Sequence, residues 1–330
     1  MSVSVSASLS DVQGAARRLQ GVALRTPLLE NARVNDRLGG RLFIKAECLQ
    51  RTGSFKLRGA YNFLSLMSGA DRAKGVVGWS SGNHAQGLAE AARLLRVKAT
   101  IIMPADAPAL KIANTRASGA EVVLYDRVKE SREEIGHGIA RDTGATIVPP
   151  YDHPWILTGQ GTAGLEIVEQ AREIGATLDA VAAPCSGGGL ATGIAVAVKG
   201  LSPSTSVHAG EPAGFDDLAR SLAAGSKQRN DKLSGSICDA LLAPTPGDVT
   251  FPLAQELLGP GLVVTDEEVL DAMELAFREF KLVVEPGGAV ALAAALTGKL
   301  PVKDRTVAVV CSGGNVDHAT FRSALERHPA

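Results

Sequence analysis

Residues 76–80 read VVGWS, and they run directly into SSGNHAQGLA (residues 80–89). The first piece is an apolar run of strand length, and the second has the small polar residues of a turn followed by a helical pattern. A strand that enters a helix through a short turn is half of a βαβ unit. This stretch therefore favours an α/β protein with a parallel sheet.

Comparable runs recur on both sides of this stretch. One series contains ATIIMP (99–104), EVVLY (121–125) and ATIVPP (145–150), and a second contains DAVAAPC (179–185), VHAGE (207–211) and TVAVVCS (306–312). Helical patterns such as DEEVLDAMELAFREF (266–280) lie between the runs. Two series predict two doubly wound α/β lobes with mainly parallel sheets, and residues 152–160 are the expected crossing between them.

The composition narrows the class of function. The 330 residues carry 34 basic and 35 acidic side chains, with no block of like charges, so nucleic-acid and membrane partners are not expected. The four cysteines are far apart and form no CxxC pair, and the N-terminus has no export signal. The sequence predicts a cytoplasmic protein that acts on a small molecule.

The ends of the strands are the places to look for a site, because ligands of open α/β sheets bind beyond the carboxyl ends of the strands. PCSGGGLATG (184–193) follows one predicted strand. Three consecutive glycines at the start of a helix let several backbone amides converge on one anion, most simply a monophosphate. The alternative is a tight structural turn. The GxGxxG pattern of dinucleotide sites fits poorly.

A lysine stands in an unusual position in TGSFKLRGAYN (52–62). Ser54 is the expected N-cap of a helix, which places Lys56 in the first turn. The helix dipole and a partly dry pocket would both lower the pKa of that amine, as Schiff-base chemistry requires. The alternative is a solvent-exposed lysine at a helix start.

Two further strand ends carry polar groups. In SSGNHAQGLA the turn offers backbone N–H groups and the Asn83 amide to a carboxylate or a ring oxygen. The alternative is that Ser81 or Asn83 is an ordinary helix N-cap and that His84 is buried in the core. In VAVVCSGGNVD (307–317) Ser312 is expected at the tip of the strand, where its hydroxyl could face a ligand. The alternative is that this serine is only a structural cap. Together, the amine, phosphate cradle, turn and hydroxyl match the needs of pyridoxal phosphate.

In their order and spacing, SFKLRGAYN, SSGNHAQG, SGGGL and CSGGN resemble the threonine dehydratase and serine racemase group of fold-type-II pyridoxal-phosphate enzymes, over residues 20–320. The resemblance implies a tryptophan synthase beta-like fold and a homodimer or other homo-oligomer. It also implies a large cofactor-binding domain (1–68 and 157–330), a small domain (69–156) and no C-terminal regulatory domain.

The resemblance also implies roles for individual residues. Lys56 binds the cofactor aldehyde, Asn83 its ring hydroxyl and Ser312 its pyridine nitrogen, while the phosphate lies against Ser186, Gly187, Gly188, Gly189 and Leu190. Ser81, Gly82 and His84 line the turn for the substrate carboxylate. GEPAGFDDLARS (210–221) matches a magnesium or calcium site, with Glu211, the Phe215 carbonyl and Asp217 as ligands. Arg132 matches an arginine that reaches dicarboxylate ligands, or else lies on a solvated helix face.

The implied activity is β-elimination from L-threonine or L-serine, which yields 2-oxobutanoate or pyruvate plus ammonia. A hydroxyl at the pyridine nitrogen favours loss of a β-leaving group over prolonged carbanion chemistry. Lys56 is the implied base, and Ser81 is the second acid/base of the racemases, which favours some racemase activity. Tyr151 stands where dehydratases of this group often have an aromatic residue, which favours elimination. The segment CDALLAPTPGD (238–248) departs from the usual pattern of the group. Serine racemase and 3-hydroxyaspartate dehydratase are therefore the alternatives.

Overall fold

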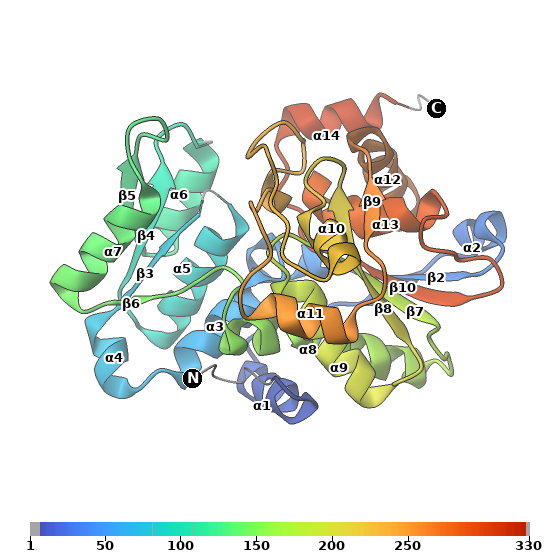
Figure 1. Cartoon of the computed structure of the whole chain (residues 1–330), viewed down its shortest axis with the longest axis horizontal. Coiled ribbons are helices and arrows are strands. Elements are labelled where there is room, and N and C mark those ends of the chain that lie inside the picture. The colour runs from blue at the N-terminus through green and yellow to red at the C-terminus, as the bar shows by residue number, and fades with distance from the viewer. Residues whose placement is uncertain (1–6, 81, 108, 328–330) are drawn as a thin grey trace.

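The computed structural model describes residues 7–80, 82–107 and 109–327. Within these ranges the strands form one six-stranded and one four-stranded sheet, in two lobes that lie side by side in Figure 1. The two α/β lobes predicted from the sequence are confirmed.

The larger sheet has the strand order β1-β2-β10-β7-β8-β9. Its strands are β1 (Leu28–Glu30), β2 (Arg41–Lys45), β7 (Ala180–Pro184), β8 (Ser206–Pro212), β9 (Leu262–Val264) and β10 (Thr306–Val310). β1 is antiparallel to β2, and the other pairs are parallel. The sequence predicted β7, β8 and β10 but not the other three, because β1 and β9 are only three residues long and β2 has a basic residue at each end.

The smaller sheet has the order β5-β4-β3-β6, and all its pairs are parallel. Its strands are β3 (Val76–Trp79), β4 (Ala99–Pro104), β5 (Glu121–Tyr125) and β6 (Thr146–Ile147). All four lie within or overlap the runs predicted from the sequence. Because the pairs are parallel, the carboxyl ends of the four strands lie at the same end of the sheet.

The helices cover both sheets, and α3 packs against helices of both lobes, α5 and α8. Around the small sheet lie α3 (Lys56–Leu66), α4 (Gly69–Lys74), α5 (Asn83–Leu95), α6 (Ala109–Ala117) and α7 (Arg132–Thr143). The large lobe contains α1 (Leu9–Leu19), α2 (Ala32–Leu38), α8 (Pro154–Glu173), α9 (Gly189–Leu201), α10 (Asp217–Ala224), α11 (Thr250–Leu257), α12 (Asp266–Phe280), α13 (Pro286–Leu296) and α14 (His318–Leu325). Short 3-10 turns span Glu47–Leu49, Arg51–Gly53 and Asp239–Leu241.

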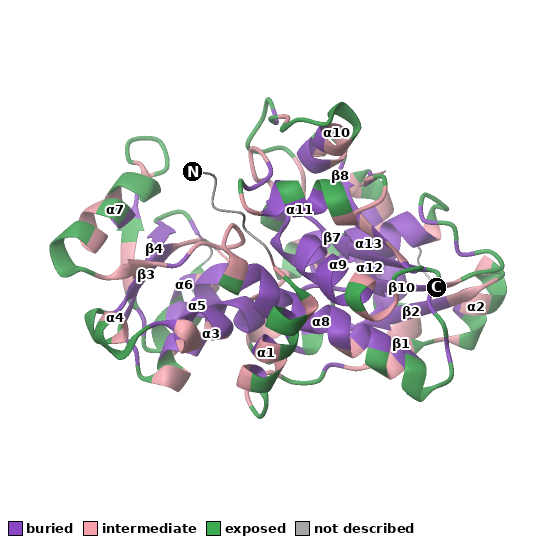
Figure 2. Cartoon of the chain, turned by 60° about the horizontal axis from the view of Figure 1, so that its bottom comes forward, coloured by how far each residue is buried: buried purple, intermediate pink, exposed green. Residues whose placement is uncertain are grey.

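Burial is concentrated in the strands and in α8, α9 and α13 (Figure 2). The longest apolar run of the sequence, residues 289–296, is the buried core helix α13. Across residues 7–80, 82–107 and 109–327, no helix is both long and apolar enough to cross a bilayer.

The four cysteines are free and buried in this core. Burial raises the pKa of Cys48 and Cys238 to about 12, and it raises the pKa of Cys185 and Cys311 well above the usual range.

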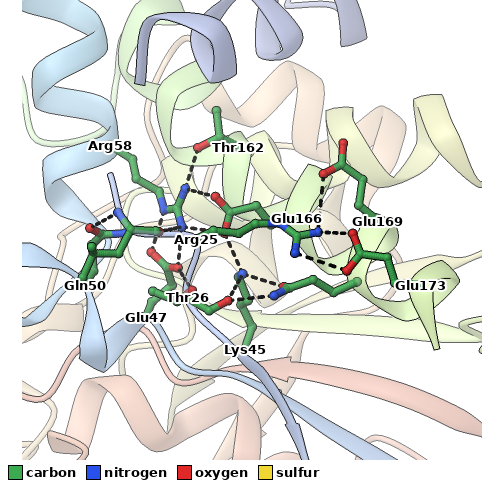
Figure 3. A network of polar contacts seen from close by, with 12 residues as sticks. Arg25, Thr26, Lys45, Glu47, Gln50, Arg58, Thr162, Glu166, Glu169 and Glu173 are labelled. Atoms are coloured by element: carbon green, nitrogen blue, oxygen red, sulfur yellow. Dashed lines mark hydrogen bonds and ion pairs between the residues drawn. The ribbon is translucent and has the colours of Figure 1, made fainter. Parts of the chain in front are cut away.

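A buried network of charged side chains holds α3 against the large lobe (Figure 3). The Arg58 guanidinium donates to both carboxylate oxygens of Glu47 (2.7 and 2.8 Å) and to Glu166 Oε1 (2.7 Å). Lys45 Nζ donates to Glu166 Oε2 (2.6 Å). Arg58, Glu47 and Lys45 are 0% exposed, so each buried charge has an opposite charge beside it. The network fixes the helix that begins at Lys56.

Candidate active site

The TGSFK stretch lies beside the loop that follows β10. The Phe55 N–H donates to the Ser312 carbonyl (3.1 Å), and the Gly314 N–H donates to the Gly53 carbonyl (2.9 Å). Ser54 pairs with Gly313 as an isolated antiparallel bridge. Two motifs about 250 residues apart in the sequence are thereby placed side by side, and Ser312 lies next to the start of α3.

The prediction that Ser54 is the N-cap of this helix is wrong. Phe55 occupies that position, and Ser54 is extended, with φ −163° and ψ 161°. Pairing with Gly313 takes Ser54 out of the cap geometry. Its hydroxyl is buried and has no hydrogen-bond partner within the described residues.

Lys56 is the first residue of α3, and its amine reaches the segment just before α8. Nζ donates to the Pro150 carbonyl (2.8 Å) and lies 5.0 Å from the centre of the Phe55 ring. Burial lowers the pKa of Lys56 to about 8, although the nearby Glu285 carboxylate acts in the opposite direction. The predicted lowering of this pKa is confirmed, and an uncharged amine is accessible near neutral pH.

The glycine loop after β7 forms an anion cradle. Gly188 has φ +100°, and a Cβ there would lie 2.8 Å from Thr250 Oγ1, so the loop needs glycine at this position. In the part of the chain that the structure describes, the N–H groups of Gly187, Gly189 and Leu190 donate to no acceptor. These free amides at the start of α9 fit one phosphate group. Ser186 adjoins them, and its Oγ accepts from the Ala243 N–H (3.2 Å).

Tyr151 connects this cradle to Lys56. Its ring lies so close to Gly187 that a Cβ on that residue would overlap it. The preceding residue, Pro150, accepts the hydrogen bond from the Lys56 amine. Pyridoxal phosphate needs an amine and a phosphate cradle together, and the described residues supply both beside one another.

The turn after β3 provides the next part of the site. Gly82 precedes α5, and its N–H donates to Ser80 Oγ (3.1 Å). Asn83 begins α5, and its Nδ2 donates to Glu285 Oε1 (2.5 Å) while its Oδ1 accepts from Asn315 Nδ2 (2.7 Å). The predicted second acid/base, Ser81, lies outside the described residues.

The His84 side chain is part of the core beneath the turn. It is 4% exposed, and its Nε2–H donates to the Val148 carbonyl (3.0 Å), which fixes the neutral tautomer. Burial, and secondly the charge of Lys56, lower the pKa of His84 to about 3. The ring therefore stays uncharged at neutral pH, and its Nε2 is not free for a substrate carboxylate.

The sequence reasoning missed Glu285. This residue is 4% exposed and lies immediately before α13. Burial raises the pKa of Glu285 to about 7, although the hydrogen bond from Asn83 lowers it. The charge of Asp239 also raises this pKa, and the charges of Lys111 and Lys56 lower it. The available signal was an acidic residue within the apolar segment VVEPGG (283–288), just before a helix-starting proline.

Arg132 lies at the rim of the small lobe, as the first residue of α7. It lines a narrow pocket at the carboxyl ends of β3, β4 and β5 together with Ser80, Ile102, Pro104, Tyr125 and Arg127. Its side chain is 44% exposed and pairs with Glu133 (2.9 Å). Burial raises the pKa of Tyr151 to about 12, and the positive charge of Arg132 acts in the opposite direction.

Glu211 and Asp217 come together between β8 and α10. Glu211 accepts from the Leu218 and Ala219 N–H groups (3.0 and 2.7 Å), and Asp217 Oδ1 accepts from Asn230 Nδ2 (2.6 Å). Asp217 Oδ2 is buried without a partner within the described residues. Burial raises the pKa of Asp217 to about 6 and that of Glu211 well above its usual range.

The predicted metal site therefore consists of two carboxylates plus the carbonyl of buried Phe215. Over the described ranges, no three side chains of the His, Cys, Asp and Glu types are grouped so as to hold a metal ion. The orphaned Asp217 oxygen fits a hard cation, and the metal remains a prediction.

Comparison with known proteins agrees with this geometry. Residues 19–313 match the model of the family described as pyridoxal-phosphate dependent enzyme. The chain is 44% identical to L-threo-3-hydroxyaspartate ammonia-lyase of Pseudomonas sp. over 97% of this chain and 98% of that protein. It is 40% identical to serine racemase of Schizosaccharomyces pombe over 96% of this chain and 97% of the racemase.

A solved structure is similar over the same extent. Threonine deaminase of T.th. superposes with a TM-score of 0.88 at 44% sequence identity, over 94% of this chain and 99% of that one. The strand ends that carry the motifs are therefore embedded in a fold shared with known enzymes of this kind.

Proposed function

Since the chain belongs to the pyridoxal-phosphate-dependent enzymes, in the group of ammonia-lyases and racemases, we propose that it is an ammonia-lyase of 3-hydroxy amino acids with a preference for L-threo-3-hydroxyaspartate. β-Elimination of water followed by hydrolysis yields a 2-oxo acid and ammonia. L-Threonine and L-serine are the next substrates in this proposal.

The proposed residues fit the cofactor at each of its polar groups. Lys56 would hold the aldehyde, Asn83 the ring hydroxyl and Ser312 the pyridine nitrogen, and the phosphate would rest on the free amides of Gly187, Gly189 and Leu190 with Ser186 and Gly188 beside them. Bound pyridoxal phosphate supplies an electron sink for the α-carbon of an amino acid.

The protein's own groups provide positioning and proton transfer. The Lys56 amine, with its pKa lowered to about 8, is suited to take the α-proton and hold it at Nζ. The Gly82 turn and Ser81 would bind the substrate carboxylate. Burial around the Lys56 amine strengthens the electrostatic interactions that it makes.

The position of Arg132 is the observation that supports 3-hydroxyaspartate as the proposed substrate. Arg132 and Arg127 line a narrow pocket that also includes Ser80, the residue just before the proposed carboxylate turn. A β-carboxylate is the group of 3-hydroxyaspartate that threonine and serine lack, and arginine binds carboxylates in a bidentate geometry. The name of the Pseudomonas relative supports the same substrate.

Replacing Arg132 with alanine is expected to raise the KM for L-threo-3-hydroxyaspartate about tenfold to a hundredfold, because a charge-assisted hydrogen bond is lost. The KM values for L-serine and L-threonine should stay nearly constant. Steady-state assays of oxo-acid release measure this. Lys129→Ala is the matched control, since it removes a nearby positive charge outside the pocket. Equal losses for all three substrates would contradict the proposal.

Elimination from L-threonine or L-serine is the second candidate function. Tyr151 covers the glycine loop, and an aromatic residue there favours elimination, as in the dehydratases that the sequence resembles. The similar threonine deaminase structure supports this candidate. Serine racemase activity is the third, and measuring D-serine alongside pyruvate in the same assays separates it from elimination.

We also propose that Glu211, the Phe215 carbonyl and Asp217 bind Mg²⁺ or Ca²⁺. At a cation concentration about 100 times its dissociation constant, the folded protein should gain about 2.7 kcal/mol. Thermal melts after chelation, with and without added cation, measure this gain. Asp217→Asn should abolish it, whereas Asp216→Asn, on the neighbouring residue that pairs with Arg220, should retain it. A cation response that survives Asp217→Asn would overturn this site.

A further inference from the structure

The amide of Asn83 is held at both ends. Nδ2 donates to Glu285 Oε1 (2.5 Å), and Oδ1 accepts from Asn315 Nδ2 (2.7 Å). Asn315 Nδ2 also donates to the Thr52 carbonyl (2.8 Å). The contacts run from Thr52, four residues before Lys56, across to the first residue of α5 and on to the start of α13. They join the two lobes at the proposed cofactor site.

The partners of Asn83 are themselves fixed. The Glu285 N–H donates to the Gly313 carbonyl (3.0 Å), and a Cβ on Gly313 would overlap the Glu285 carboxylate. A Cβ on Gly53, which has φ +69°, would lie 2.6 Å from Asn315 Oδ1. The two glycines thus leave room for these two side chains to approach the backbone closely.

Thr52 also has an unusual backbone. Its φ of +64° is in the left-handed region, which a β-branched residue rarely adopts. The surrounding structure must hold such a residue in place, and strained residues of this kind cluster at functional sites. The hydrogen bond from Asn315 to its carbonyl is one such restraint.

An asparagine amide has two N–H donors and one carbonyl acceptor. Glu285 takes one N–H of Asn83 and Asn315 occupies its oxygen, so the amide cannot flip and one N–H remains free. We propose that Glu285 and Asn315 are positioning residues, which aim that remaining N–H of Asn83 at the ring oxygen of pyridoxal phosphate. This inference rests on the proposed placement of Asn83 at the cofactor.

The charge on Glu285 gives the arrangement a pH signature. Burial raises its pKa to about 7, and the facing charged groups are Lys56 on α3, Lys111 on α6 and Asp239 in the 3-10 turn Asp239–Leu241. Lys111 and Asp239 pair with each other across the lobes (3.5 Å). Above its pKa Glu285 is a carboxylate that orients the Asn83 amide strongly, and below it the neutral acid does so more weakly.

The test uses the cofactor-loaded enzyme without substrate. Asn315→Ala and Glu285→Ala should each speed cofactor loss on dilution about tenfold and shift the absorbance maximum of the bound cofactor. Glu285→Gln keeps the acceptor and removes the charge, so it should retain the cofactor better than Glu285→Ala but lose the spectral change centred near pH 7. Glu274→Gln is the matched control, because Glu274 is also a buried acid but pairs with Arg278 on α12.

The outcomes separate this inference from the function on which it rests. If the spectrum, its pH dependence and the rate of cofactor loss match the parent enzyme in Glu285→Gln and Asn315→Ala, the positioning role is overturned. If Asn83→Ala leaves the same properties unchanged, the placement of Asn83 itself fails. In addition, kcat should fall in Asn315→Ala with little change in KM. If Asn315 had a purely structural role, its replacement would instead lower the melting temperature of the cofactor-free protein and leave the absorbance spectrum of the bound cofactor unchanged.

Discussion

An enzyme in which Lys56 is replaced by alanine is expected to lose at least about a thousandfold in kcat on every substrate. The amine of Lys56 is the group proposed both to hold the cofactor and to take the α-proton, and among the described residues no other lysine donates to the Pro150 carbonyl. Steady-state assays with 3-hydroxyaspartate, threonine and serine measure the loss. The absorbance of lysine-bound cofactor should disappear in the same variant.

The pH dependence of cofactor capture gives an independent check. Burial lowers the pKa of Lys56 to about 8, so the free amine becomes the major form only as the pH rises through that value. The rate at which cofactor-free protein takes up pyridoxal phosphate should therefore rise up to about pH 8 and then level off. Lys74→Ala, at an exposed position on α4, should behave like the parent. Retained turnover in Lys56→Ala would end the proposed mechanism.

Replacing Arg58 with methionine is expected to cost about 3–5 kcal/mol in the free energy of unfolding. The substitution leaves Glu47 buried beside only one remaining cation, Lys45. Urea unfolding of the cofactor-free protein measures the loss. Arg25→Ala is the control, because Arg25 pairs with Glu173 at 2.5 Å in the same region but both side chains are about half exposed, and exposed pairs contribute at most about 1 kcal/mol.

The Arg58 variant should also respond to pH. In the parent, burial tends to raise the pKa of Glu47, but the charge and hydrogen bonds of Arg58 lower it on balance. Its stabilisation is therefore present at neutral pH and lost as the pH falls through that lowered pKa. Without Arg58 the carboxyl takes up a proton at higher pH, so the deficit of the variant should shrink on mild acidification. A deficit independent of pH would exclude an uncompensated Glu47 as its cause.

The motifs at the strand ends were predictable because each is local. The runs before Ser80, Ser186 and Ser312 indicate buried strands, and glycines or small polar residues mark where the chain turns toward the site. The start of α3 was predicted within one residue, but its cap was not. The pairing of Ser54 with Gly313, which displaced that cap, joins segments far apart in the sequence.

The supporting residues share this difficulty. Glu285 and Asn83 are separated by 202 residues, and Arg58 and Glu166 by 108. A single acid or arginine in the sequence does not name its partner, and only the packing of α3, α8 and α13 brings these charges together. The sequence thus contained the groups proposed to touch the cofactor, while the groups that fix their geometry required the structure.

The four buried thiols have a practical consequence. Because the thiolate is the reactive form, alkylating reagents and mild oxidants should spare Cys48, Cys185, Cys238 and Cys311 as long as the chain stays folded. The speed of labelling then reports how often the core opens, and reducing agents can be left out of storage buffers without loss of turnover.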